Sequence, residues 1–394
     1  MSTATKPGGM RPPRIPRPRL NDARVQSKHQ HMHQFWQRIT EGMELEQLWS
    51  QFVVDAQSSY KFYSREVSPQ ENVPRHIRIW RAVKAFFWAV LTKLTPAKRL
   101  LLLVALMLLF FPTFRVENER FTFQSGSFTF WAGLILLVLL VLEVAERVTM
   151  KRDLEIAREI QLWLVPSTPP TIPGLDLAFV NRPANTVAGD FYDVFYRRRP
   201  DGTDAPLLVV ADVAGKSLPA ALLMATFQAS LKTLSATPCE LTELVARVNQ
   251  YACAHSNGGL RFTTAFFGEI DPGNRCLRYV NAGHNQPILR RLDGECERMD
   301  RGGLPLGIRA GAPYEDGVVQ LREGDTLLIF TDGLVEAENE QGTEYGEENL
   351  PTFLKASANA SAHDALQFLM ADVNRFVGQA RPHDDITCLL AKIQ

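Results

Sequence analysis

The sequence has few cysteines, and their spacing excludes two classes of protein. There are five in 394 residues, an odd number, and no two of them form a Cys-x-x-Cys pair. A disulfide framework uses an even set of cysteines, and a zinc ribbon uses Cys-x-x-Cys pairs. We therefore expect neither, and we expect the water-soluble part of the chain to work in the reducing cytoplasm.

Several common catalytic motifs are also missing. The chain has no GxxxxGK[ST] phosphate-binding loop, no GxSxG elbow and no catalytic-cysteine motif.

The first 20 residues lack the apolar core of a signal peptide. The 43 basic and 43 acidic residues give a formal net charge of zero, so charge favours no particular partner, and we expect no nucleic acid among them. The length predicts two or three domains.

The N-terminal part has two distinct compositions. Residues 1–20 alternate arginine with proline in "RPPRIPRPRL", which is typical of a disordered basic tail. The alternative is a tail that lies against anionic membrane lipid. Apolar residues recur at helical spacing after position 20, so residues 21–97 predict a helical cytoplasmic region.

Two uncharged apolar segments follow, at Leu100–Phe114 and Phe121–Leu142. The second is long enough to cross a bilayer core of about 30 Å at about 1.5 Å per residue. The first is shorter, so its charged neighbours would have to reach the headgroups. Two buried helices of a soluble domain are disfavoured, because such helices rarely lack a polar face. Residues 98–143 therefore predict a transmembrane helical hairpin.

Flanking charge predicts the orientation of this hairpin. The connecting loop holds only Arg115 and Arg120, which Glu117 and Glu119 offset. Basic residues lie on both outer sides of the apolar pair: Arg81, Lys84, Lys93, Lys98 and Arg99 before it, and Arg147, Lys151, Arg152 and Arg158 after it. The positive-inside rule then predicts a multi-pass protein of the cell (inner) membrane, with both termini and the C-terminal domain in the cytoplasm.

A continuous linker helix is predicted over residues 144–165, which contain no helix breaker. Its heptad pattern is imperfect, so a homodimer through this helix is a weaker expectation. Prolines cluster from Pro166 onward and mark a domain boundary. From there to the C-terminus, runs of strands alternate with grouped helices, and residues 166–394 predict one α+β domain.

Acidic residues recur at the ends of apolar strands in this domain. They are Asp190 in "VAGDFYD", Asp212 in "ADVAGK", Asp332 in "FTDG", and Asp384 with Asp385 in "HDDIT". Each alone is typical of a turn, but so many together indicate a shared cation. Because every ligand offered is a hard oxygen, the pattern favours Mg²⁺ or Mn²⁺ over Zn²⁺. Two such ions would activate a water for attack on a phosphoryl group.

The order of motifs resembles a known family. "AREIQLWLVPSTPPTIPGLDLAFVNRPANTVAGDFYDVF", "VVADVAGKSLPAALLMA", "FTTAFFGEID", "YVNAGHNQP", "PLGI", "LREGDTLLIFTDGLVEAENEQGTEYG" and "DDIT" follow one another over about 157–394. This set resembles the PPM/PP2C-type serine/threonine phosphatases of the bacterial SpoIIE/RsbU-like branch. The resemblance implies an α/β/β/α sandwich of two antiparallel sheets flanked by helices, with two Mn²⁺ or Mg²⁺ ions at one end.

The resemblance also implies roles for individual residues. Asp212 would bridge both ions, and the carbonyl group of Val213 would help to hold the second. Asp332 and Asp384 would bind the first ion, and Asp190 would lie beside them as a further metal-site acid. In this reading Asp212, Asp332 and Asp384 carry the catalysis.

One position differs from eukaryotic relatives of the family, and two motifs depart from the pattern of the bacterial branch. Asp385 stands where eukaryotic relatives often have asparagine, which implies a supporting role. Ala188-Gly189-Asp190 replaces the usual Gly-Gly-Asp, a mild change. Gly215-Lys216-Ser217 replaces a frequent Gly-Lys-Gly and stiffens the turn before the predicted helix at 218–236, a helix thought to take part in switching within this branch.

Two further roles stay open. No residue clearly matches the phosphate-binding arginine of eukaryotic relatives, and Arg182 and Lys216 are candidates by position only. His284 in "AGHN" has the chemistry of a general acid, but a structural histidine in a packed corner is the favoured interpretation.

The sequence therefore predicts a membrane-anchored, metal-dependent phosphatase. The resemblance implies phosphoserine or phosphothreonine on a signalling protein as substrate, such as a STAS-domain anti-anti-sigma factor. One alternative is a pseudophosphatase that senses and binds a partner without turnover. Another is a structural membrane scaffold, which predicts no effect of metal on stability.

Overall fold

The computed structural model describes residues 88, 94–110, 115–118, 121–124, 128–215, 217–256, 261–271 and 273–394. The predicted basic tail, most of the predicted helical region 21–97, and Lys216 lie outside the described residues. The chain divides into two units, residues 1–141 and 142–394, and each is described by itself.

The N-terminal unit contains a short helix, a hairpin and the start of a long helix. The helix α4 (Pro96–Phe110) is followed by the antiparallel strands β1 (Arg115–Asn118) and β2 (Phe121–Gln124). The helix α5 (Phe128–Leu164) then runs without a break into the second unit. Within the uncharged segment Phe121–Leu142, the first four residues form β2 and pair with β1, and the helix begins at Phe128.

The helix α5 carries the apolar stretch best suited to a membrane. Among the helices within the described residues, it alone is long and apolar enough to cross a membrane, as judged by length and composition. The 15 residues of α4 span only about 22 Å at about 1.5 Å per residue, less than a bilayer core of about 30 Å. Membrane association through α5 has this support, and a second crossing stays a prediction.

The C-terminal unit is built from two sheets. The first has the order β10-β7-β6-β5-β4, with β11 paired to β7. The second has the order β3-β13-β12-β8-β9. Strands of the first sheet are β4 (Phe191–Arg198), β5 (Asp204–Val213), β6 (Thr263–Asp271), β7 (Cys276–Ala282), β10 (Gly302–Gly303) and β11 (Gly317–Gln320). Strands of the second are β3 (Leu175–Arg182), β8 (Ile288–Arg290), β9 (Cys296–Arg298), β12 (Thr326–Phe330) and β13 (Ile386–Ile393).

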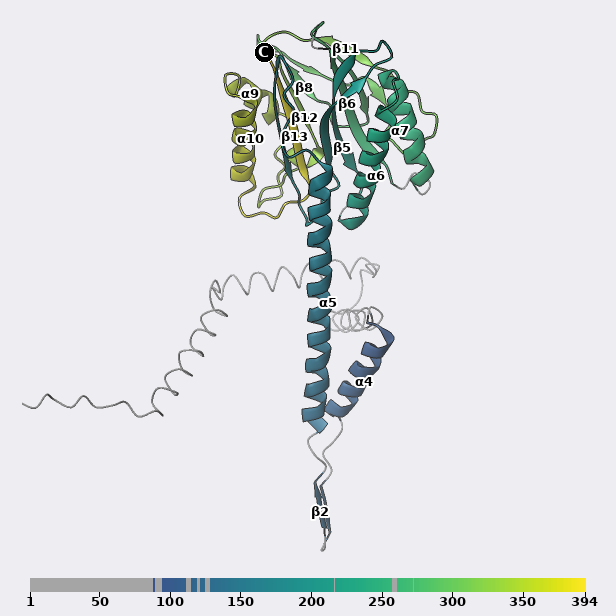
Figure 1. Cartoon of the computed structure of the whole chain (residues 1–394). Coiled ribbons are helices and arrows are strands. Elements are labelled where there is room, and N and C mark those ends of the chain that lie inside the picture. The colour runs from purple at the N-terminus through teal and green to yellow at the C-terminus, as the bar shows by residue number, and fades with distance from the viewer. Residues whose placement is uncertain are drawn as a thin grey trace, which may run out of the picture. The chain divides into compact units, whose positions relative to one another are not determined.

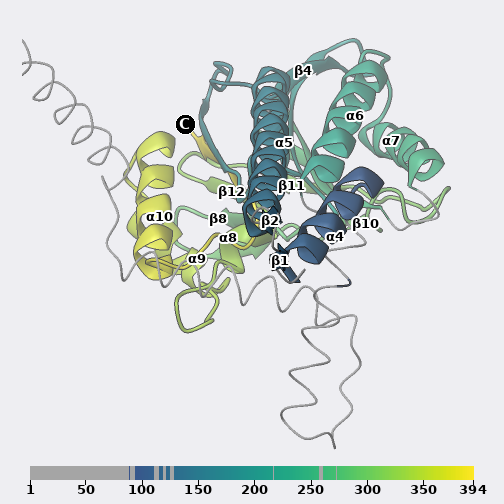
Figure 2. The same ribbon diagram turned by 90° about the horizontal axis from the view of Figure 1, so that it is seen from below.

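Helices cover the outer face of each sheet, which gives four layers. On the first sheet lie α6 (Leu218–Ser235) and α7 (Leu241–His255), and on the second lie α9 (Asn349–Ala356) and α10 (Ala362–Val377). The two helix pairs lie on opposite sides of the sheets in both views (Figures 1 and 2). The predicted α/β/β/α sandwich is confirmed.

The layers follow from the alternation of side chains along strands. In β5, Leu207 and Val209 pack against α6 and α7, whereas Leu208 and Val210 face the second sheet. Both faces are buried, so the strand is apolar throughout. Asp212 continues the alternation that points toward the second sheet, and this places its carboxylate between the two sheets at their end.

The grouped helices that the sequence predicts are α6, α7, α9 and α10, and the helix predicted at 218–236 corresponds to α6 within one residue. One pair of strands departs from the predicted antiparallel pattern, because β10 runs parallel to β7. Glycine permits this pairing: a β-carbon at Gly302 would lie 1.8 Å from the carbonyl oxygen of Asn281. The described residues also contain the four-residue helix α8 (Asp332–Val335), which was not predicted.

Candidate active site

The predicted acids come from strand ends that lie at one end of the sandwich. In the first sheet, Phe191 pairs with Ala211, so the next residues outward are Asp190 and Asp212. In the second sheet, Phe330 pairs with Cys388, so the chain leaving β12 and the chain entering β13 lie side by side. Asp332 follows the first of these ends, and Asp384 and Asp385 precede the second.

Asp190 is buried and held by hydroxyl groups. Its side chain is 3% exposed, and the hydroxyl group of Thr331 donates to its Oδ2 at 2.9 Å. Burial raises the pKa of Asp190 well above its ordinary value, and the charge of Asp212 adds to the rise. Hydrogen bonds from Thr387 and Thr331 oppose the rise by stabilising the carboxylate.

The pKa of Asp212 depends on how close the other acids lie to it. Its pKa is raised from 3.8 to about 7, first by burial and then by the charges of Asp332, Asp384 and Asp385, in that order of effect. A hydrogen bond with Asp190 lowers it. Five carboxyl groups from both sheets therefore share one electrostatic environment, which favours the protonated form of Asp212.

Asp332 is the first residue of α8, directly after the buried strand β12. The helix turns at once because Gly333 lies against the backbone that enters β13. A β-carbon at position 333 would lie 2.0 Å from the carbonyl oxygen of Asp385. The Asp-Gly pair thus brings Asp332 beside the Asp384-Asp385 segment, and only glycine allows the approach.

Asp385 binds the loop that leads into β4. The backbone N–H of Ala184 donates to its Oδ1 at 2.7 Å, and that of Gly189 donates to its Oδ2 at 2.6 Å. Burial raises the pKa of this carboxyl, and these backbone N–H groups lower it. Both carboxylate oxygens of Asp385 accept hydrogen bonds from backbone N–H groups, which fits the supporting role that the resemblance implies.

The carbonyl group of Val213 faces the same loop. Val213 ends β5 and is 1% exposed. A β-carbon at Gly189 would lie 3.3 Å from the Val213 oxygen and 3.2 Å from the β-carbon of Ala220. The loop before Asp190 therefore packs tightly against the end of β5 and the start of α6.

The donor set of these acids suits one class of metal ion. The charges of Asp332, Asp384 and Asp385 are close enough to raise the pKa of Asp212, but no three His, Cys, Asp or Glu side chains in the described part of the chain converge as a ready-formed metal site. A cation would offset the repulsion that raises the pKa of Asp212. Since all the donors are carboxylate or carbonyl oxygens, the residues fit a hard divalent cation such as Mg²⁺ or Mn²⁺.

The turn before α6 departs from ordinary backbone geometry. Gly215 has φ +121°, and Ser217 has φ 66° and ψ −149°, a region that glycine favours. The side chain of Ser217 makes no capping hydrogen bond with the helix. The serine that replaces the family's glycine therefore strains this turn as well as stiffening it.

His284 occupies a buried corner, as the favoured interpretation expects. Its backbone N–H donates to Oδ1 of Asn281 at 2.7 Å, and its Nδ1 lies 3.0 Å from the hydroxyl oxygen of Thr264, the residue that pairs with Asp212. Burial lowers the pKa of His284 to about 4, so the ring is neutral at pH 7.

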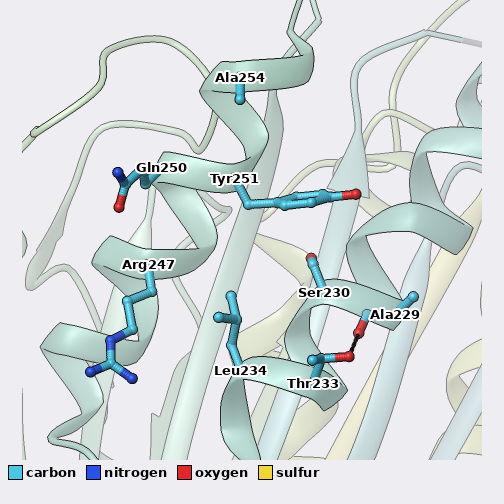
Figure 3. A pocket seen from close by; sticks show the side chains of 8 residues that line it. All are labelled: Ala229, Ser230, Thr233, Leu234, Arg247, Gln250, Tyr251 and Ala254. Carbon is cyan, nitrogen blue, oxygen red and sulfur yellow. Dashed lines mark hydrogen bonds between the residues drawn. The ribbon is translucent and has the colours of Figure 1, made fainter.

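Of the two phosphate-binding candidates, one lies within the described residues. Arg182 donates to the side chain of Asn374 in α10. Lys216 lies outside the described residues. A cavity of about 540 Å³ opens between α6 and α7, but none of the predicted acids lines it (Figure 3). The residue that would hold a substrate phosphate stays unassigned.

Sequence reasoning missed three contacts at this site. Thr331 and Thr387 hold Asp190, although both hydroxyl residues stand within the quoted motifs "FTDG" and "HDDIT". Gln161, in the quoted "AREIQ", forms two hydrogen bonds with the backbone of Ala188. A hydroxyl residue beside a motif acid was the available signal for the two threonines, and Gln161 had none.

Known proteins share both the sequence pattern and the fold of this domain. The sequence profile of the family described as Stage II sporulation protein E (SpoIIE) matches residues 203–394. This part of the chain, just under half of it, is similar to SpoIIE-type PP2C domains. The SiaA-PP2C domain of Pseudomonas aeruginosa has the same fold, with a TM-score of 0.55, 22% identity, and coverage of 64% of this chain and 99% of that one.

Two relatives of the SpoIIE-type domain extend the match upstream or name an activity. Protein IcfG of Synechocystis sp. (strain ATCC 27184 / PCC 6803 / Kazusa) is 26% identical over 263 residues, 60% of this chain and 41% of IcfG. Phosphoserine phosphatase RsbU of Bacillus subtilis (strain 168) is 26% identical over 194 residues, 49% of this chain and 56% of RsbU. The chain spans about half the length of these two relatives.

Proposed function

We propose that the chain is a metal-dependent phosphoprotein phosphatase that hydrolyses phosphoserine or phosphothreonine. The observation that carries this proposal is the convergence of acids from both sheets at one end of the sandwich, where Asp190 and Asp212 end neighbouring strands and the chain carrying Asp332 lies beside the chain carrying Asp384. The raised pKa of Asp212, caused by burial and by three neighbouring carboxylates, agrees with a site that a cation would stabilise. The relative RsbU is named as a phosphoserine phosphatase, which supports phosphoserine as the substrate class proposed for this chain.

The residues that would hold two Mn²⁺ or Mg²⁺ ions are those named from the resemblance: Asp190, Asp212, Asp332 and Asp384, with the carbonyl group of Val213. When bound, the ions would supply a water of lowered pKa and neutralise charge on the phosphoryl group. Within the chain, burial and the neighbouring carboxylates raise the pKa of Asp212, so a bound cation would compete with a proton for this carboxylate. Thr331 fixes one oxygen of Asp190, and Asp385 fixes the loop that carries Asp190.

The substrate is proposed to be a phosphorylated protein. Direct hydrolysis by an activated water needs no covalent nucleophile, which agrees with the missing nucleophile motifs. The finer proposal is a STAS-domain anti-anti-sigma factor, and it rests on the family resemblance alone. The pseudophosphatase alternative predicts binding of such a partner without release of phosphate.

The membrane part is proposed to anchor this domain at the inner face of the cell membrane. The apolar part of α5 supports association with lipid. We retain the hairpin with both termini in the cytoplasm as the finer proposal, because basic residues flank both of its ends. The exposed linker part of α5, with Val148 62% exposed and Ile156 46% exposed, supports a homodimer through this helix.

The test is phosphate release by the full-length protein purified in detergent. We expect Mn²⁺- or Mg²⁺-dependent hydrolysis of a phosphoserine peptide and of a generic aryl phosphate, and its loss with EDTA. An Asp212→Asn variant should lose turnover and retain the phosphorylated partner in a pull-down. Partner binding by wild type without any hydrolysis would support the pseudophosphatase instead, and full activity after exhaustive chelation would contradict the metal-dependent proposal.

A further inference from the structure

The end of helix α5 is joined to the loop that carries Asp190 by one glutamine side chain. Nε2 of Gln161 donates to the carbonyl oxygen of Ala188 at 2.6 Å. The backbone N–H of Ala188 donates in turn to Oε1 of Gln161 at 2.9 Å. Both polar atoms of the side chain thus pair with both polar atoms of one residue, as two strands pair in a sheet.

This pairing needs an amide. Glutamate offers no donor for the carbonyl oxygen of Ala188, and methionine offers neither donor nor a strong acceptor. The neighbours of Gln161 do not share its environment: Leu162 is 58% exposed and Trp163 is 80% exposed, whereas Gln161 is half-buried. The side chain therefore points into the domain from a turn of helix that is otherwise largely open to solvent.

The loop that Gln161 holds is the one that Asp385 holds from the other side. Asp385 accepts hydrogen bonds from Ala184 and Gly189, and Gly189 stands between Ala188 and Asp190 in the chain. The loop is thus fixed by Gln161 at Ala188 and by Asp385 one residue later. Val187 and Ala188 are 2% and 3% exposed, so water does not substitute easily for the Gln161 amide.

The rest of the helix end has its own contacts with the domain. The side chain of Gln228 in α6 donates to the carbonyl oxygen of Leu164 at 3.4 Å. The hydroxyl group of Tyr192 donates to the carbonyl oxygen of Pro166 at 3.1 Å. Removing the Gln161 amide would therefore leave the helix attached. Its loss would release the Ala188 backbone, which lies two residues from Asp190.

We propose that Gln161 is a positioning residue for the metal site. By holding the Ala188 peptide on both of its polar sides, it sets Gly189 against Asp385 and Asp190 against Asp212. The inference rests on the proposed function, because positioning matters only if the acids bind cations. It also extends the catalytic unit upstream of Pro166, into the helix that precedes the phosphatase fold.

The first measurement needs neither metal nor substrate. In the metal-free full-length protein in detergent, we expect amide hydrogen exchange in the segment 184–190 to be at least tenfold faster in Gln161→Met than in wild type. Gln367→Met is the matched control, since Gln367 is an exposed glutamine of α10. The control should exchange as wild type does in this segment.

The second measurement is Mn²⁺ affinity by calorimetry, with kinetics on a phosphoserine peptide. We expect Gln161→Met to bind Mn²⁺ about tenfold more weakly and to lose about tenfold in kcat, with KM within twofold of wild type and a melting temperature within a few degrees. Gln161→Glu keeps the hydrogen bond from the N–H of Ala188 but sets an acceptor oxygen against its carbonyl oxygen, so it should also fall below wild type in Mn²⁺ affinity and kcat. It also tests the inference if Gln161→Met does not fold.

The outcomes separate the two proposals. Unchanged exchange in segment 184–190 of Gln161→Met would overturn the positioning role, whatever the protein catalyses. Faster exchange with unchanged Mn²⁺ affinity and kcat, in a protein whose wild type binds Mn²⁺ and releases phosphate, would overturn the inference alone. A wild type that neither binds Mn²⁺ nor releases phosphate would overturn the proposed function and the inference with it.

Discussion

Gly333 lies directly against the carbonyl group of Asp385, so that a β-carbon at position 333 would come within 2.0 Å of the Asp385 oxygen. This contact brings together two acid-bearing strand ends of the second sheet, one carrying Asp332 and the other carrying Asp384 and Asp385. The chain that leaves the buried strand β12 carries Asp332 next to Gly333 because the acid lies beside the backbone of Asp385. Only glycine can approach that backbone so closely.

Gly333→Ala should be costly for this reason. The clash is with backbone, which cannot rotate away, and overpacking of this kind costs about 1–3 kcal/mol. We expect the free energy of unfolding in denaturant to fall by about that amount, and phosphate release to fall with it. Gly273→Ala is the control, because a β-carbon there meets only the Asp271 side chain, at 3.4 Å. Equal stability of the two variants would show that the backbone yields at Gly333.

The pKa of Asp212 predicts how stability depends on pH without metal. A carboxyl whose pKa rises from 3.8 to about 7 on folding binds more protons in the native state than in the unfolded state between those values. Stability must then fall as pH rises through this window, by up to about 1.4 kcal/mol for each pH unit crossed. Asp212 thus contributes a loss of stability between pH 4.5 and pH 7.5 in the metal-free protein, whereas His284, whose pKa burial lowers to about 4, contributes in the opposite direction up to about pH 6.5.

Asp212→Asn isolates this effect from other titrating groups such as His284. The difference in unfolding free energy between the variant and wild type should grow in favour of the variant as pH rises from 4 to 7, measured in EDTA. A difference that stays constant across this range would mean that the carboxyl of Asp212 titrates normally in the folded protein.

Ser217 offers a test of stored backbone strain. Its φ of 66° with ψ −149° is a conformation that costs a non-glycine residue about 1–3 kcal/mol. Ser217→Gly should raise the free energy of unfolding by about 1 kcal/mol, after the entropic cost of glycine of about 0.5–1 kcal/mol is subtracted. Ser361→Gly, at the start of α10, should instead lower it slightly, because Ser361 has φ −63° and accepts a hydrogen bond from the backbone N–H of Asp364. Destabilisation by both would remove the claim of strain.

The membrane topology is tested with tags in cells. A reporter placed after Arg158 should be cytoplasmic, and a tag in the loop between Glu117 and Arg120 should be accessible from outside. Both follow from the basic residues that flank the apolar segments. Protease digestion of the phosphatase domain in intact cells would contradict this orientation.

The sequence predicts the parts of the fold that depend on local pattern. The helices α6, α7 and α10 have apolar faces with a helical period, and β5, β12 and β13 are continuous apolar runs, so each was found within a few residues. The short elements α8 and β10 were missed. Their formation depends on contacts between distant segments, such as Gly302 against Asn281, which no local window contains.

The same division applies to the site. The acids were found because each follows or precedes an apolar strand, a local signal. Gln161 was not singled out, because its partner lies 27 residues further along the chain and the hydrogen bonds are to backbone, which has no sequence signal. Thr331 was missed because a hydroxyl residue in a strand has many ordinary structural uses.

The most direct measurement compares wild type with Asp332→Asn in thermal melting, with EDTA and with Mn²⁺, alongside phosphate release from a phosphoserine peptide. With EDTA, the variant should be as stable as wild type or more so, because it removes a charge that repels Asp212. With Mn²⁺, the order should reverse, since the stabilisation by bound metal is larger for wild type. Turnover of the variant should fall by orders of magnitude. If Asp332→Asn destabilises the protein equally in both conditions, or keeps most of its turnover, Asp332 is a turn residue and the acids do not gather for a cation.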